Sequence, residues 1–234
     1  MAGVSTKERN IKFSAEKFND YLKHDGVLDM LAYRKENKLL EEDALEAYQK
    51  HVKAIYQVGN EKTDDWKTVL GYPIEFVPKE NPYEKFSGDH IEVQLLLEGN
   101  SLANQLVYAD YISTDKEHSH GDSGHSHSHS DNEEHTHTNG QQLRTDANGV
   151  IKVDLPHDGI YYLRTIHMVP VTNEGDLTHR SKWATLTFEI SHKHGPDTHT
   201  HESHDHKDGI PIWVFILGSV AVIGLLFLFF RKKG

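Results

Sequence analysis

The hydrophobic residues near the start of the chain recur at the spacing of amphipathic helices. A first helix is expected between Ser14, which is suited to cap its start, and Gly26, which is placed to end it. A second helix is expected over residues 27–33, and a third over residues 41–58, where apolar side chains again follow a helical period. Residues 1–60 are therefore predicted to form a helical segment.

From residue 71 onwards, hydrophobic and polar residues alternate, which is the period of β-strands. Glycine, proline and asparagine separate the alternating stretches, as expected of turns. Short strands in this arrangement are typical of a β-sandwich. We predict a mainly β fold, an immunoglobulin-like or prealbumin-like β-sandwich over residues 71–191. Its strands are expected at residues 74–77, 90–97, 105–112, 150–155, 160–168 and 182–190.

An uncharged apolar stretch occupies residues 210–230 near the end of the chain. At about 1.5 Å per residue, it is long enough to cross the ~30 Å hydrocarbon core of a bilayer as one transmembrane helix. Trp213 lies near its first boundary, and the basic tail 231–234 follows it. By the positive-inside rule, the tail is cytoplasmic and the preceding domain is extracytoplasmic in a single-pass membrane protein.

The start of the chain, MAGVSTKERNIKF, contains neither the basic region nor the apolar stretch of an export signal. An extracytoplasmic domain requires such a signal, so two interpretations stay open. Either the chain is tail-anchored with its domain in the cytosol, or its start is truncated and the signal lies upstream.

Composition narrows the classes of function. The chain has 234 residues with 25 basic and 36 acidic side chains, which leaves a net charge of -11 and argues against nucleic-acid binding. It has 0 cysteines, which excludes disulfides, thiolate zinc sites, iron–sulfur clusters and cysteine nucleophiles. Any soft-metal chemistry must therefore rely on nitrogen ligands.

Histidine is over-represented, with 19 residues, and most of them fall in two tracts. The first tract, within residues 116–140, contains no apolar residue and is predicted to be a disordered loop of the sandwich. The second, residues 192–209, links the last strand to the transmembrane stretch. Both tracts repeat the unit H-x-H, and neutral imidazole suits nickel, cobalt, zinc and copper(II). We predict several exchangeable sites for divalent transition metals on these tracts.

Histidines within the sandwich are candidates for a fixed site. His90, His157, His167 and His179 are the four considered, and strand-end positions favour His167 and His179. Such histidines also serve as structural hydrogen-bonding residues. The predicted metal ligands are His118, His120, His125, His127, His129, His135, His137, His192, His194, His199, His201, His204, His206, His167 and His179.

An enzyme is not expected. The chain has no H-E-x-x-H, no G-x-S-x-G and no phosphate-binding loop, so no catalytic residues and no organic cofactor are predicted. Two non-enzymatic alternatives to metal capture stay open. The tracts are either a metal- or pH-responsive sensor that titrates near pH 6.5, or a solubilising stalk of a structural, adhesion-like module.

Four phrases of the sequence carry a family resemblance: KFNDYLKHDGVLDML, YPIEFVPKENPYEKFSGDHIEVQLLLEGNSLANQLVYA, TDANGVIKVDLPHDGIYYLRTIHM and HRSKWATLTFEI. Over residues 13–190, the chain resembles a bacterial periplasmic domain family of unknown function associated with nickel and cobalt uptake. The resemblance implies an extracytoplasmic, β-rich accessory protein of metal transport that works with an uptake permease. It also implies an export signal and an additional N-terminal β region, which favours a truncated start.

Overall fold

The computed structural model of the chain describes residues 1–59, 61–113 and 140–191, which form two β-sheets, two α-helices and two short 3₁₀ helices. The helices are α1 (Ala15–His24) and α2 (Leu28–Glu36), with η1 (Asp65–Lys67) and η2 (Pro82–Glu84). The strands are β1 (Ala2–Ser5), β2 (Arg9–Phe13), β3 (Ala44–Ala54), β4 (Ile74–Pro78), β5 (His90–Leu97), β6 (Asn100–Ser101), β7 (Leu106–Ile112), β8 (Gln141–Arg144), β9 (Val150–Asp154), β10 (Gly159–Pro170) and β11 (His179–Ile190).

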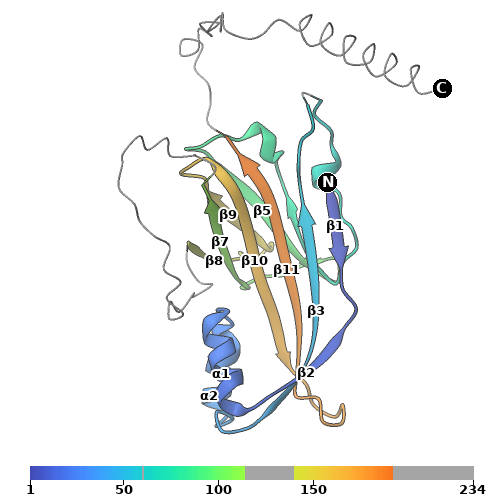
Figure 1. Cartoon of the computed structure of the whole chain (residues 1–234), viewed down its shortest axis with the longest axis vertical. Coiled ribbons are helices and arrows are strands. Elements are labelled where there is room, and N and C mark those ends of the chain that lie inside the picture. The colour runs from blue at the N-terminus through green and yellow to red at the C-terminus, as the bar shows by residue number, and fades with distance from the viewer. Residues whose placement is uncertain (60, 114–139, 192–234) are drawn as a thin grey trace, which may run out of the picture. The chain divides into compact units, whose positions relative to one another are not determined.

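The larger sheet, sheet A, has the strand order β1-β3-β11-β10-β7-β8, and β2 also pairs with β3 (Figure 1). β11 runs parallel to β3, and every other pair in sheet A is antiparallel. The smaller sheet, sheet B, has the order β4-β5-β6, with β9 paired to the other part of β5. The last strand of the described chain therefore lies in the middle of sheet A.

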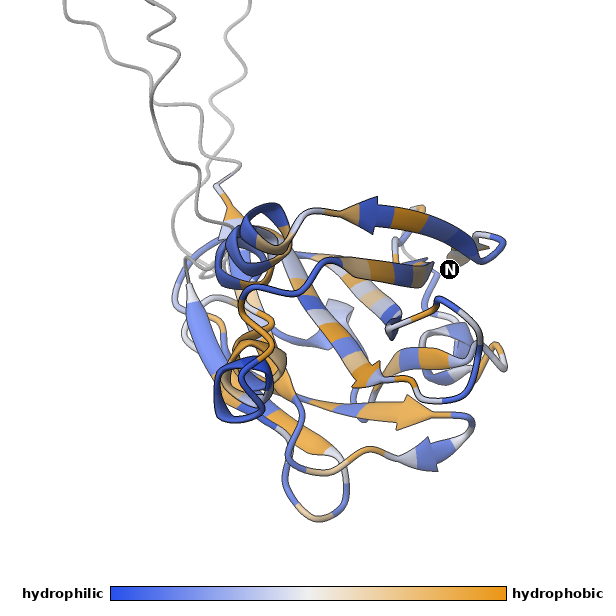
Figure 2. Ribbon diagram, turned by 90° about the horizontal axis from the view of Figure 1, so that it is seen from below, coloured by the Kyte–Doolittle hydropathy of each residue, from blue (hydrophilic) through white to orange (hydrophobic). Residues whose placement is uncertain are grey.

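One hydrophobic core is shared by the two sheets. Val93 and Leu95 of β5 are fully buried together with Val107 of β7, Leu163 of β10 and Leu186 of β11. Buried and more exposed positions alternate over most of β5, β10 and β11, whereas β7 begins with four buried residues. Figure 2 shows strands of the ribbon, seen from the helix-bearing end, in which hydrophobic and hydrophilic positions interchange. This alternation confirms the mainly β prediction, and β4, β5, β7, β9, β10 and β11 correspond to the six predicted strands.

Helices α1 and α2 pack on the outer face of sheet A. Phe18 and Leu22 of α1 and Met30 of α2 form a second buried cluster with Ile166 of β10. Gly26 joins the two helices with a φ of 73°, and a Cβ there would lie 2.4 Å from the Tyr108 ring. Both predicted helices are confirmed, and the turn between them requires glycine because no side chain fits.

The helix predicted over residues 41–58 is wrong, because this segment contains β3. The buried positions of β3 include Glu46, His51 and Lys53, whereas the apolar Val52 is 40% exposed. Polar side chains at buried positions conceal the alternating pattern of a strand. The predicted helical segment 1–60 is therefore also wrong, since β1, β2 and β3 belong to sheet A and the sandwich begins well before residue 71.

A buried ion pair connects β3 to sheet B. Lys53 Nζ lies 2.6 Å from Glu75 Oε2, and both side chains are 2% exposed. The ammonium also donates to the carbonyls of Thr68 and Phe76, at 3.1 and 2.9 Å. The Glu75 carboxylate accepts hydrogen bonds from the backbone N–H groups of residues 70, 71 and 72. Every strong donor and acceptor of the pair is therefore used, as buried charges require.

Within residues 1–59, 61–113 and 140–191, no helix is long and apolar enough to cross a membrane. The predicted transmembrane stretch 210–230, the tail 231–234 and both histidine tracts lie outside the described residues.

Candidate functional site

Three strand ends bracket the histidine tracts at one end of sheet A. The first tract follows β7, which ends at Ile112, and precedes β8, which starts at Gln141. The second tract follows β11, which ends at Ile190. Ile112 is the partner of Ile160, and Ile190 is the partner of Gly159, so β10 places both ends side by side. Ile112 and Ile190 are two strand spacings apart, or about 10 Å.

We call this region the tract-bearing end, defined by Ile112, Gln141 and Ile190. It lies opposite the end that carries α1 and α2 (Figure 1). Gln141 and Asp154 exchange two hydrogen bonds of 2.8 and 2.9 Å, and Ser87 N–H donates to the Ser191 carbonyl at 3.1 Å. Backbone and side-chain hydrogen bonds therefore hold the chain in place on both sides of the first tract and at the start of the second.

Two of the candidate histidines lie at the tract-bearing end. His157 contacts the Tyr111 ring with the centroids 5.3 Å apart, and its backbone carbonyl accepts a hydrogen bond of 2.8 Å from Tyr161 Oη. His90 begins β5 opposite Asp154 of β9, and its side chain is exposed. The backbone of His157 is thus fixed by the core, while the His90 ring faces solvent.

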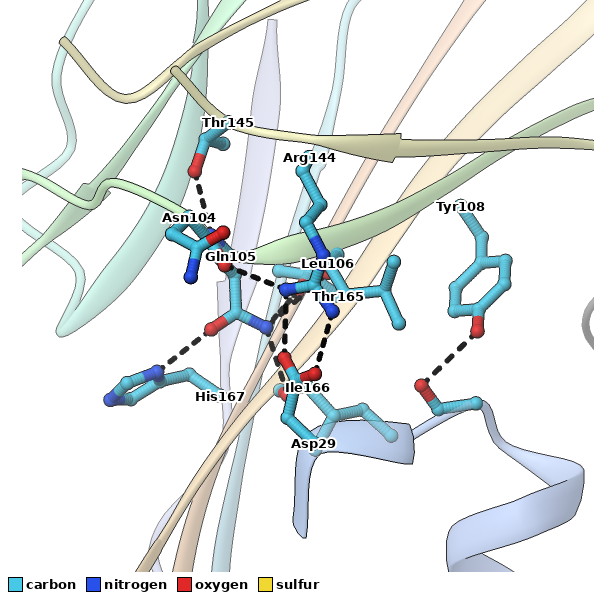
Figure 3. Close-up of polar contacts among 11 residues, drawn as sticks. Asp29, Asn104, Gln105, Leu106, Tyr108, Arg144, Thr145, Thr165, Ile166 and His167 are labelled. Atoms are coloured by element: carbon cyan, nitrogen blue, oxygen red, sulfur yellow. Dashed lines mark hydrogen bonds and ion pairs between the residues drawn. The ribbon is translucent and has the colours of Figure 1, made fainter. Parts of the chain in front are cut away.

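His167 of β10 forms a hydrogen bond with Gln105, the residue before β7 (Figure 3). Its Nδ1 lies 2.9 Å from Gln105 Oε1, and the Gln105 amide donates to Thr165 Oγ1 at 3.0 Å and to the Ile166 carbonyl at 3.3 Å. Burial, and then the charge of Lys182, lowers the pKa of His167 below its ordinary value. These contacts give His167 the role of a neutral hydrogen-bonding residue.

An ion pair beside this network joins α2 to β8, far apart in sequence (Figure 3). Arg144 donates to both oxygens of Asp29, at 2.6 and 2.9 Å, and also to the Asn104 carbonyl at 2.9 Å. Both partners are partly exposed, so the pair contributes about 1 kcal/mol or less. It joins α2 to the last residue of β8.

His179 is buried under the helices. Its side chain is 3% exposed, and Nδ1 lies 2.7 Å from Thr178 Oγ1. Burial, and then the charge of Arg34, lowers the pKa of His179 to about 4. His51 is buried in a similar way on β3, where its Nδ1 lies 2.9 Å from Ser5 Oγ and burial again lowers its pKa. Both imidazoles are neutral at physiological pH.

No cluster of three or more histidine, aspartate or glutamate side chains suited to hold a metal ion occurs in residues 1–59, 61–113 and 140–191. The described part of the chain therefore does not join His167 or His179 to further ligands. The thirteen predicted tract ligands lie outside the described residues, seven in the first tract and six in the second, and stay a prediction.

Sequence reasoning missed Arg34, which is 1% exposed and reaches from α2 across the 37–43 connection. An arginine in the last turn of an amphipathic helix ordinarily faces solvent. The signal that could have revealed it is Asn19 on the buried side of α1, whose Oδ1 accepts a 3.0 Å hydrogen bond from Arg34 Nε.

Fold and site together define a two-sheet β domain with a histidine-rich insertion and a histidine-rich extension at one end. The chain belongs to the family described as Domain of unknown function (DUF4198), whose model matches residues 6–169. That range contains β2 to β9, all of β10 except Pro170, and the first tract, and the description names no metal and no transport system. No curated protein and no solved structure matches the chain.

Proposed function

We propose that this protein is a membrane-anchored, extracytoplasmic accessory protein that captures divalent transition-metal ions on its two histidine tracts. Nickel and cobalt are the favoured cargo, with zinc and copper(II) as the alternatives that imidazole ligands also accept. The captured ion would be passed to an uptake permease. The observation that carries the proposal is the common attachment of both tracts at the tract-bearing end.

Common attachment supports capture through effective concentration. The sequence predicts that the first tract has no packed core, and two tracts attached about 10 Å apart share the same small volume, where their ligands reach millimolar effective concentration. An ion released by an imidazole of one tract is then rebound by the other before it escapes. Several weak H-x-H units on one domain thereby act as one stronger binder without a preformed site.

In this proposal, the described domain is the scaffold that carries the two tracts. Its strand ends fix the described residues next to each tract, and its own histidines have hydrogen-bonding roles or lie singly. The net charge of -11 attracts cations to the protein as a whole. The membrane anchor and the extracytoplasmic side of the proposal rest on residues 210–230 and the basic residues after them.

The proposal predicts that the two tracts bind metal jointly. Calorimetric titration of the full chain in detergent with nickel, cobalt, zinc and copper(II) is expected to show tight binding that disappears when all tract histidines become serine. Replacing the histidines of one tract alone is expected to weaken the apparent affinity about a hundredfold, because recapture is lost. His24→Ser, at the opposite end of sheet A, serves as the control and is expected to change nothing.

Other outcomes separate the rival functions. Two single-tract variants that each retain full affinity with fewer ions would show independent tracts and contradict joint capture. A tight ion that persists without tract histidines would place the site in the sandwich. If neither the unchanged chain nor any variant binds metal, the structural, adhesion-like module replaces the proposal. A sensor would instead show metal-dependent partner binding with unchanged cellular metal uptake.

A further inference from the structure

A pocket of about 230 Å³ lies at the end of sheet A opposite the tract-bearing end. It is formed by α2, the 37–43 connection and the 171–178 connection between β10 and β11, which lie at the same end of the molecule in Figure 1. Charged and polar side chains line it together with Leu39, Pro170 and Val171. The polar lining includes Tyr33, Arg34, Glu42, Asp43, Thr172 and His179.

His179 presents an unused acceptor in this lining. The Thr178 hydroxyl accepts from Leu45 N–H at 2.9 Å and donates its single proton to the Leu45 carbonyl at 3.0 Å. We assign the hydroxyl proton to the Leu45 carbonyl, so that the 2.7 Å contact with His179 Nδ1 uses the proton of the ring and Nε2 keeps a lone pair. Nε2 is buried and has no hydrogen-bond partner among the described residues.

The buried guanidinium of Arg34 also lines the pocket, with Cζ 4.9 Å from the centroid of the Phe18 ring. Its Nε and Nη2 donate to Asn19 Oδ1 and to the carbonyls of Leu39 and Glu42, at 3.0, 2.6 and 2.7 Å. Nη1 makes no hydrogen bond, and no carboxylate forms an ion pair with Arg34, within the described ranges. A guanidinium that is 1% exposed ordinarily has an anionic partner.

Glu42 and Asp43 contribute negative charge to the same lining. Asp43 Oδ1 accepts the Ala15 N–H at 3.1 Å, and neither carboxylate has a basic partner within 4.0 Å in the described part of the chain. The pocket lining thus combines a cation and two carboxylates that form no ion pair among the described residues with a neutral acceptor. A simple anion would face the two carboxylates, and a simple cation would face Arg34.

We propose that this pocket binds a small zwitterion, a free α-amino acid. The ligand carboxylate would accept from Arg34 Nη1, and its ammonium would donate to His179 Nε2 and the Asp43 carboxylate. Leu39 and Val171 would contact an aliphatic side chain. The volume is below the roughly 300 Å³ at which drug-sized sites begin, so a small or medium amino acid fits best. The proposed amino-acid binding is independent of the proposed metal capture.

The test is titration of the full chain in detergent with L-alanine, L-serine and L-valine, with a chelator present to remove metal ions. Propionate and ethylamine serve as matched ligands that each carry one of the two charges. Calorimetry measures affinity, and ¹⁵N spectra of labelled histidine report the protonation and hydrogen bonding of His179. We expect an amino acid to saturate and to shift the Nε2 resonance, with propionate and ethylamine at least tenfold weaker.

His179→Phe removes the acceptor while it keeps an aromatic ring against Phe18, so the variant is expected to fold and to bind about tenfold more weakly. His51→Phe is the matched control, because it removes a second buried histidine far from the pocket and is expected to bind normally. Full affinity in His179→Phe, equal binding of propionate, or no response to any of the three amino acids would each overturn the proposal.

Discussion

Replacing Lys53 with methionine is expected to lower the free energy of unfolding by about 3–5 kcal/mol. Methionine matches the length of the aliphatic chain but leaves the Glu75 carboxylate buried without its cation, which lies 2.6 Å away in the native protein. The carbonyls of Thr68 and Phe76 lose their donor as well. Domains are stable by only about 5–15 kcal/mol, so this substitution removes a large fraction of the total.

Urea unfolding followed by tryptophan fluorescence measures this loss, with Lys62→Met as the matched control. Lys62 pairs with Glu84 at 3.4 Å, and the two side chains are 50% and 59% exposed. Water screens such a pair, so the control is expected to change stability by less than about 1 kcal/mol. A Lys53→Met variant as stable as this control would contradict the assigned role of the buried pair.

Lowering the pH from about 7.5 to 5 is expected to destabilise the domain by about 2 kcal/mol through His179 alone. Burial and Arg34 lower its folded-state pKa to about 4, whereas an unfolded histidine has a pKa of about 6.5. The unfolded state therefore binds the proton first as the pH falls. The stabilisation is complete above about pH 6.5, and roughly 3 kcal/mol is lost once the pH is below both values.

His179→Phe isolates this contribution, because phenylalanine cannot titrate. Urea unfolding at the two pH values is expected to show a pH-dependent loss about 2 kcal/mol smaller than in the unchanged protein. His51 and His167 also have lowered pKa values, so part of the acid sensitivity is expected to persist in the variant. His90→Phe, at an exposed position, is the control. An unchanged pH dependence in His179→Phe would contradict the prediction.

The strands of the core were predictable where burial and hydrophobicity coincide. β5 was predicted with its observed bounds, since its buried Ile91, Val93 and Leu95 alternate with more exposed positions. β8 was missed because it has only four residues and directly follows the first tract. Its only apolar side chain is Leu143, so no period is visible.

β3 was not predictable from the same pattern, because its environment differs along its length. Glu46 lies under α1, and its carboxylate accepts hydrogen bonds from Tyr21 of α1 and Ser181 of β11. His51 and Lys53 are buried with partners from β1 and sheet B. Each of these residues is buried only because of a contact distant in sequence, so local hydrophobicity indicates the wrong structure.

The candidate site was also only partly predictable from the sequence. The H-x-H tracts and their chemistry are visible in the sequence, but their attachment at one end depends on β10 lying between β7 and β11. The roles of His167 and His179 depend equally on partners from other elements, Gln105 and Arg34. Strand order and burial are tertiary properties, and periodicity does not contain them.

The position of β11 also determines when the domain can form during synthesis. Sheet A is incomplete until this last strand pairs with β3 on one side and β10 on the other. Until then, β3 and β10 each have an unpaired edge, which exposes the chain to aggregation. Such non-local pairing also gives a high contact order, and domains of this kind fold in milliseconds to seconds. Folding of this domain is therefore expected to be slow and to follow, rather than accompany, the synthesis of most of its residues.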